Sequence, residues 1–175
     1  MQHFVRQGTV FVSQLDEVER QVITEAVSDV LTLVSTHSGG MDPAMNRLFP
    51  PMTLEDPFLA EELGAAARDE LLLAKTAALR TILSDMEVSR VVVDAPDVER
   101  WLRGLTDVRL VLAERLELDG PEDADELYAL AVAAGTSQPP TDVPPERLAL
   151  AVLYSGLTWW QESLLEALQE DWDQN

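Results

Sequence analysis

The sequence of 175 residues contains no cysteine, one lysine and two histidines. Without cysteine the chain has no disulfide, no thiolate metal ligand and no thiol that could serve as a redox switch. His3 and His37 lie far apart and do not stand in a metal-binding spacing such as His-Glu-x-x-His. The sequence therefore predicts no metal and no other cofactor.

Basic residues are few, with 12 Lys and Arg against 32 Asp and Glu and a net charge of -20 at pH 7. Affinity for nucleic acid comes largely from Lys and Arg that displace counterions from phosphates, and the eleven arginines are scattered along the chain. Direct binding to DNA is disfavoured, although charge can segregate in three dimensions. An anionic membrane surface is disfavoured for the same reason.

Long hydrophobic runs and catalytic signatures are missing too. No segment approaches the roughly 18 to 20 apolar residues that span a bilayer, and the first residues, MQHFVRQGTVFV, lack the apolar core of a signal peptide. A cytoplasmic location is the expectation. The Ser-x-x-Lys, Gly-x-Ser-x-Gly, P-loop and Gly-x-Gly-x-x-Gly patterns are absent, so the sequence does not support an enzyme.

Hydrophobic residues make up 46% of the chain, and their spacing predicts one mainly α domain over residues 1–175. We expect five or six helices and a small antiparallel or mixed β-sheet at one edge. The sheet consists of a hairpin, 3–6 with 9–12 around Gln7-Gly8, and a third strand at 89–93. The helices are expected at 13 or 16 to 35, from Pro57 to about 86 with a break at Gly64, 96–118, 122–134, and 145–172 with a bend at Gly156; residues 36–56 are expected to form a long connection with one helical turn.

A charged residue interrupts one apolar stripe. Arg109 stands in the series Leu102, Leu105, Leu112 and Leu116, and Lys75 stands among leucines in the same way. A buried cation must extend its head to water or pair with a carboxylate, because a lone buried charge is costly.

The acids nearest to apolar stripes are Asp56, Asp107 and Glu162, so we expect one of them to pair with Arg109 as a structural buried charge. The alternative is that Arg109 or Lys75 meets a small anion in a ligand-binding or catalytic pocket.

Two adjacent tryptophans, Trp159 and Trp160, cannot share one narrow helical stripe, because neighbouring residues point about 100° apart. Trp160 aligns with Leu153, Leu157 and Leu164 and is expected in the core. Trp159 is then the freer ring, and Trp159 and Trp172 are the candidate interaction residues, since exposed indoles are enriched in interfaces. The acids Glu166, Glu170 and Asp173 have helical spacing, which is more typical of a solvated face than of a cation site.

Several segments resemble a known family. These are Arg47-Leu48-Phe49-Pro50, Asp56-Pro57, Trp101-Leu102, Leu105-Thr106-Asp107-Val108-Arg109-Leu110, Arg115-Leu116, Tyr154, Leu157-Thr158 and Gln161-Glu162. In them the chain is similar to an actinobacterial domain-of-unknown-function family, also described as AosR-like after an oxidative-stress regulator.

The resemblance implies a non-enzymatic regulator that acts on transcription through a protein partner such as a sigma factor. Sensing by cysteine does not carry over, because this chain has none. We therefore expect an interaction protein whose acidic surface attracts a basic partner, with a homodimer left open.

Overall fold

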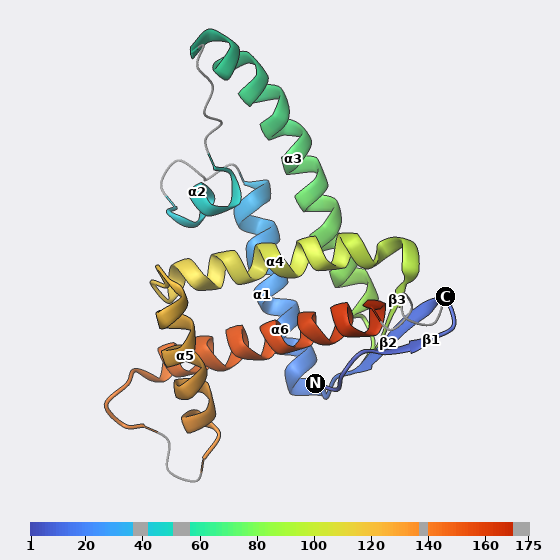
Figure 1. Ribbon diagram of the computed structural model, residues 1–175, viewed down its shortest axis with the longest axis vertical. Coiled ribbons are helices and arrows are strands. Elements are labelled where there is room, and N and C mark those ends of the chain that lie inside the picture. Colours follow the sequence, from blue (N-terminus) through green and yellow to red (C-terminus); the bar gives the residue numbers. More distant parts are fainter. Residues whose placement is uncertain (37–41, 51–56, 137–139, 170–175) are drawn as a thin grey trace.

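The computed structural model describes residues 1–36, 42–50, 57–136 and 140–169. It confirms a mainly α fold with a small sheet at one edge (Figure 1). Its helices are α1 Glu17–Ser35, α2 Ala44–Leu48, α3 Pro57–Asp85, α4 Val98–Arg115, α5 Pro121–Ala134 and α6 Pro145–Gln169, and its strands are β1 Val5–Gln7, β2 Val10–Gln14 and β3 Arg90–Asp94.

The three strands form an antiparallel sheet in the order β1-β2-β3, as the β-branched runs predict. The turn residues of the hairpin are Gly8 and Thr9, one residue later than the predicted pair Gln7-Gly8. Gly8 has a φ of +67°, which glycine adopts at little steric cost. Phe11 pairs with Val93 across the sheet, and both side chains are buried. Alternation along the strands thus turns one face of the sheet to the helical core.

Asp16 is the N-cap of helix α1, which resolves the choice between Ser13 and Asp16. The Asp16 carboxylate accepts a hydrogen bond from the Glu19 backbone N–H at 2.8 Å, and the Glu19 carboxylate accepts one from the Asp16 N–H at 2.9 Å. This reciprocal capping box satisfies backbone donors that the first turn leaves free. Ser13 instead lies within β2.

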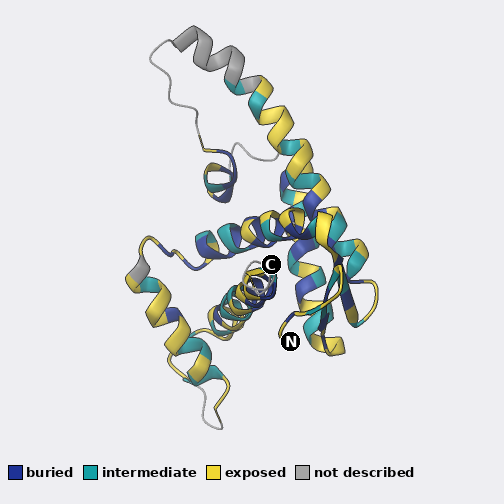
Figure 2. Ribbon diagram, turned by 45° about the vertical axis from the view of Figure 1, so that its right-hand side comes forward, coloured by how far each residue is buried: buried dark blue, intermediate teal, exposed yellow. Residues whose placement is uncertain are grey.

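Helix α4 occupies the centre of the fold and packs against α1, α2, α3, α6 and β3. Figure 2 shows buried residues along much of this helix. Trp101 of α4 is fully buried, with its ring centroid 5.6 Å from that of Trp160 of α6, and Trp160 stacks on Phe4 at 5.0 Å. This aromatic cluster joins the segment before β1 to helices α4 and α6.

The structure corrects one expectation about glycine. Helix α3 continues through Gly64 as one helix of 29 residues. Helix α6 runs through Gly156, where the sequence predicts a bend within one helix. A single glycine lowers helix stability by about 1 kcal/mol, which does not end a helix that lacks a competing turn signal. At Gly156 a Cβ atom would lie 2.6 Å from the Met1 side chain, so the small residue allows close packing. The expected cap Asp56 lies outside the described residues.

Helices α3 and α4 cross closely at Gly104, where an added Cβ would lie 2.6 Å from Cδ1 of buried Ile82. We predict that Gly104→Val lowers the free energy of unfolding by about 2 kcal/mol or more through overpacking. Gly64→Ala, which meets no described atom within 4 Å, should instead raise it by about 0.5 to 1 kcal/mol. Urea unfolding measures both, and a Gly104→Val protein as stable as the wild type would contradict the close crossing.

Candidate functional site

An ion pair between α3 and α4 is the most deeply buried charged contact in the described part of the chain. Lys75 Nζ lies 2.5 Å from Asp107 Oδ1, and the two side chains are 13% and 4% exposed. Burial raises the pKa of Asp107 above its ordinary value, while the hydrogen bond from Lys75 opposes the rise. Oδ2 of Asp107 is buried without a hydrogen-bond partner among the described residues. The charged form of Asp107 is therefore disfavoured by burial and stabilised by Lys75.

Arg109 has a neutral partner, so the expectation of a paired acid is wrong for the residues that the structure describes. Its NH1 group donates to Gln161 Oε1 at 3.0 Å, and its guanidinium lies 5.4 Å from the ring centroid of Tyr154. Asp107 could not serve, because residues two positions apart on a helix point in different directions. Asp107 faces α3 instead.

Glu162, another expected partner of Arg109, is exposed on α6 and supplies no buried carboxylate. The third expected partner, Asp56, lies outside the described residues. Gln161 is 8% exposed and donates its Nε2 hydrogen to Thr106 Oγ1 at 2.9 Å. Arg109 is half-buried, and its Nε is buried without a hydrogen-bond partner among the described residues. The amide oxygen of Gln161 and the aromatic face of Tyr154 are the contacts that offset the burial of its charge.

The segments that carry the family resemblance meet around α4. Arg47 of α2 binds Glu114 at 2.5 Å and donates to the Leu118 carbonyl at 2.9 Å. The Phe49 ring lies 5.8 Å from Lys75 Nζ. Together with the contact between Arg109 and Gln161, these contacts determine which helix packs against each side of α4. Packing of the helices is therefore sufficient to explain why these residues occur in the resembling segments.

A groove of about 930 Å³ lies between α1, α4 and α6 and was not predicted from the sequence. Its apolar lining comes from three helices that are distant in the sequence. The lining residues are Val22, Ala26, Val30 and Leu33 of α1, Val108, Val111 and Leu112 of α4, and Ala149, Leu150 and Leu153 of α6. The feature of the sequence that could have indicated this groove is the apolar stripe of α1, which is wider than contact with one helix requires.

The charged groups that line this groove are mostly acidic. Glu25, Asp29 and Glu146 lie along it, and Arg115 is the one base in its lining. Arg115 is held by Asp42 at 2.5 Å, and this contact keeps the pKa of Asp42 below its ordinary value. The free charge of the groove is therefore negative.

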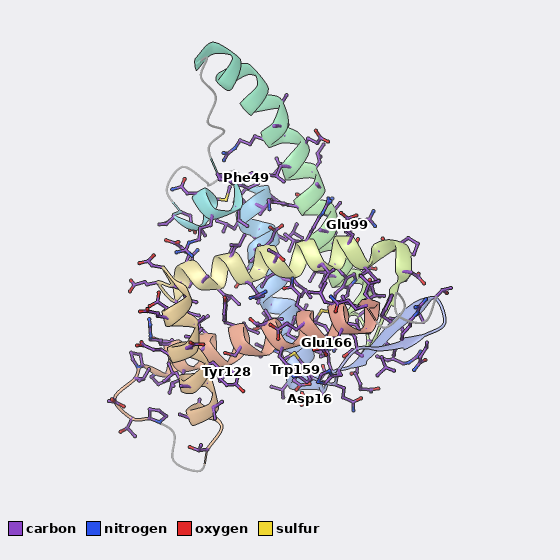
Figure 3. All side chains as sticks on the ribbon, in the orientation of Figure 1. Asp16, Phe49, Glu99, Tyr128, Trp159 and Glu166 are labelled. Carbon is purple, nitrogen blue, oxygen red and sulfur yellow. The ribbon has the colours of Figure 1, made fainter. Side chains whose placement is uncertain are left out.

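The two adjacent indoles differ as predicted. Trp160 is fully buried and donates to Ser13 Oγ at 2.8 Å, whereas Trp159 is 38% exposed. The His3 ring meets Trp159 edge-on at 4.2 Å, and Figure 3 shows Trp159 on the same helix as Glu166. Val152, 47% exposed, precedes Trp159 by two turns on the same side of α6. This outer face of α6, defined by Val152 and Trp159, is a second apolar surface.

Most of the remaining candidate residues lie outside the part of the chain that the structure describes. Trp172, Glu170 and Asp173 lie outside them. No group of three or more His, Asp or Glu side chains in the described ranges could hold a metal ion. Within the same ranges, no helix combines the length and apolar character needed to cross a membrane.

The Lys75 pair generates a pH-dependent prediction. In Lys75→Met, Asp107 becomes a lone buried carboxylate, so the free energy of unfolding at pH 7 should fall by about 3 to 5 kcal/mol. The folded pKa of Asp107 then rises further above the unfolded value of about 4. An acid with a raised folded pKa binds its proton more tightly when folded, so the loss should shrink as the pH falls toward about 4. Denaturant unfolding of both proteins across this pH range measures it.

The matched control replaces both partners. Lys75→Met with Asp107→Leu should be close to the wild type in stability and should show little of the added pH dependence, because no unpaired charge remains. A loss in Lys75→Met that is equal at both ends of the pH range would show that Asp107 is not the titrating group.

Comparison with known proteins identifies the family of the chain. No curated protein and no solved structure matches it. A family model described as Domain of unknown function (DUF2017) matches residues 1–168, which include all three described strands and nearly all of α6. The chain therefore belongs to the DUF2017 family of domains of unknown function.

Proposed function

We propose that this protein is a non-enzymatic regulatory protein that binds a basic, amphipathic segment of another protein. The observation that carries the proposal is the groove between α1, α4 and α6, which has an apolar floor and an acidic rim. An amphipathic helix lays its apolar side into such a groove and leaves its charged sides at the rim. Lys and Arg at those positions would meet Glu25, Asp29 and Glu146.

The apolar floor supplies the lasting part of the contact. Val22 is 41% exposed, and Leu33, Leu150 and Leu153 are each only partly buried. The three leucines pack against the core and are still only partly covered by the fold. Burying them against a partner removes apolar surface from water, which favours association.

The negative charge of the protein raises the rate at which a basic segment associates with it. A net charge of -20 attracts a basic segment over a distance set by the ionic strength. Opposite charges mainly raise the association rate, while close apolar contacts set the rate of dissociation.

The regulatory part of the proposal rests on the resemblance to AosR-like actinobacterial proteins. It favours a cytoplasmic role in transcription or the stress response, with a transcription component such as a sigma factor as partner. A sensor based on thiol oxidation is ruled out in this chain by its lack of cysteine.

A small-anion-binding or enzymatic role for Lys75 and Arg109 has less support. Lys75 is already paired with Asp107, and Arg109 is bonded to Gln161. The cleft lined by Lys75 does not include Arg109 in its lining. A thermal-shift screen with nucleotides, phosphates and carboxylates tests this role, because specific stabilisation by an anion at micromolar concentration would favour it.

The proposal predicts selective binding of a model peptide. A helical peptide with leucines at positions i, i+3, i+4 and i+7 and lysines on its flanks should bind, whereas the same leucines flanked by glutamate should not. Stopped-flow fluorescence should show that raising NaCl from about 0.05 to 0.5 M slows association more than it speeds dissociation.

Two variants of matched charge locate the contact. Ala149→Arg puts a cation on the groove lining and should weaken peptide binding at least about tenfold. Val152→Arg puts the same charge on the outer face of α6 and should change binding by less than about threefold. Trp159→Ala tests the surface that the sequence predicts, where an indole hot spot would contribute about 2 kcal/mol or more.

Other outcomes would change the conclusion. If Val152→Arg and Trp159→Ala abolish binding while Ala149→Arg has no effect, the outer face of α6 is the binding surface. Equal binding of the acidic and basic peptides, or tight binding of duplex DNA at physiological salt, would overturn the proposal.

A further inference from the structure

The negative charge of the protein is distributed very unevenly. Residues 68–115, which form most of α3, all of β3 and all of α4, contain eight Lys and Arg and nine Asp and Glu, so they are almost neutral. The rest of the chain contains four basic and 23 acidic residues. The surface built by α3 and α4 therefore carries much less net negative charge than the surface around the groove.

The charged groups near the junction of α3 and α4 are also paired within the chain. Lys75 pairs with Asp107, and Arg103 pairs with Glu99 on the solvent side of α4. All four of these residues line a cleft of about 420 Å³ between the two helices. The cleft consequently presents both signs of charge in balance.

Apolar side chains are exposed on this same surface. Leu71 is 38% exposed and lines the cleft with Ala74, Leu102 and Leu110. Leu73 is 72% exposed, but it stands two positions from Leu71 on the helix and therefore points away from the cleft. Figure 2 shows many exposed residues along α3. We define the α3–α4 face by Leu71, Ala74 and the cleft.

We propose that the α3–α4 face binds a second copy of this chain in a twofold dimer. Two copies that each carry a charge of -20 repel one another, so they can meet closely only where the local charge is balanced. A twofold axis brings the same face of both copies together, and a surface with adjacent positive and negative groups is then complementary to itself. The exposed leucines provide the apolar contact.

This dimer is independent of the groove proposed for the basic partner, and salt distinguishes the two. Binding of a basic segment is driven by attraction between opposite charges, so salt weakens it. Dimerisation through a neutral face works against the repulsion of two acidic molecules, so salt strengthens it. The two contacts therefore respond to ionic strength with opposite signs.

Sedimentation equilibrium of the full chain tests the dimer. The wild type should show a monomer–dimer equilibrium whose dissociation constant falls at least about threefold between about 0.05 and 0.5 M NaCl. Leu71→Glu and Arg103→Glu should each raise that constant by about tenfold or more, since each places uncompensated acid in the interface. Both residues are exposed, and circular dichroism confirms that the variants are folded.

Matched controls separate the face from net charge. Arg147→Glu changes the charge of the molecule as much as Arg103→Glu does, and Val132→Glu introduces an acid at an apolar position of α5 that is 55% exposed. Both lie outside the α3–α4 face and should leave the dissociation constant within about threefold of the wild type. The double variant Arg103→Glu with Glu99→Arg restores the local balance and should recover the dimer.

Three results would overturn the inference. They are a monomer at all concentrations and salt levels, a dimer that salt weakens, and a dimer that Leu71→Glu and Arg103→Glu affect no more than Arg147→Glu and Val132→Glu do. The last result would place the contact elsewhere on the molecule. None of the three bears on peptide binding in the groove, which is measured separately.

Discussion

The enclosure of α4 by four helices and a strand is the constraint on which the rest of the structure depends. A helix surrounded in this way can keep polar side chains only if its neighbours supply their partners. Asp107 requires Lys75 of α3, Glu114 requires Arg47 of α2, and Arg109 requires Gln161 of α6. Each contact identifies one neighbour, so together they specify the order of helices around α4 in a way that interchangeable leucines could not.

The two sides of the molecule have different physical properties. The side built from α1 and the start of α6 combines a groove with acidic groups, whereas α3 and α4 give a nearly neutral side with exposed leucines. The first suits a partner of opposite charge, and the second suits a partner of the same kind. Separation of this sort allows one small domain to hold two partners without competition between them.

The sequence predicted the elements better than their contacts. Periods of 2 and 3.6 identified the hairpin, the third strand and the helices, because these patterns are local. The partner of Arg109 was not predictable, since it depends on which face of α6 meets α4, and Gln161 carries no charge to indicate the contact. The groove lines up residues from Val22 to Leu153, so no local pattern could define it. Trp160 was assigned to the core correctly because it extends a regular stripe of leucines.

The contact between β2 and α6 has a consequence for synthesis of the chain. Ser13 accepts the hydrogen bond of the Trp160 indole, 147 positions later, and Phe4 stacks on the same ring. At a synthesis rate of about 5 to 20 residues per second, roughly 7 to 30 s pass between synthesis of the hairpin and synthesis of Trp160. During this interval the apolar side of the sheet has no cover from α6. The nascent chain is therefore most exposed to aggregation or to chaperones before its last helix emerges.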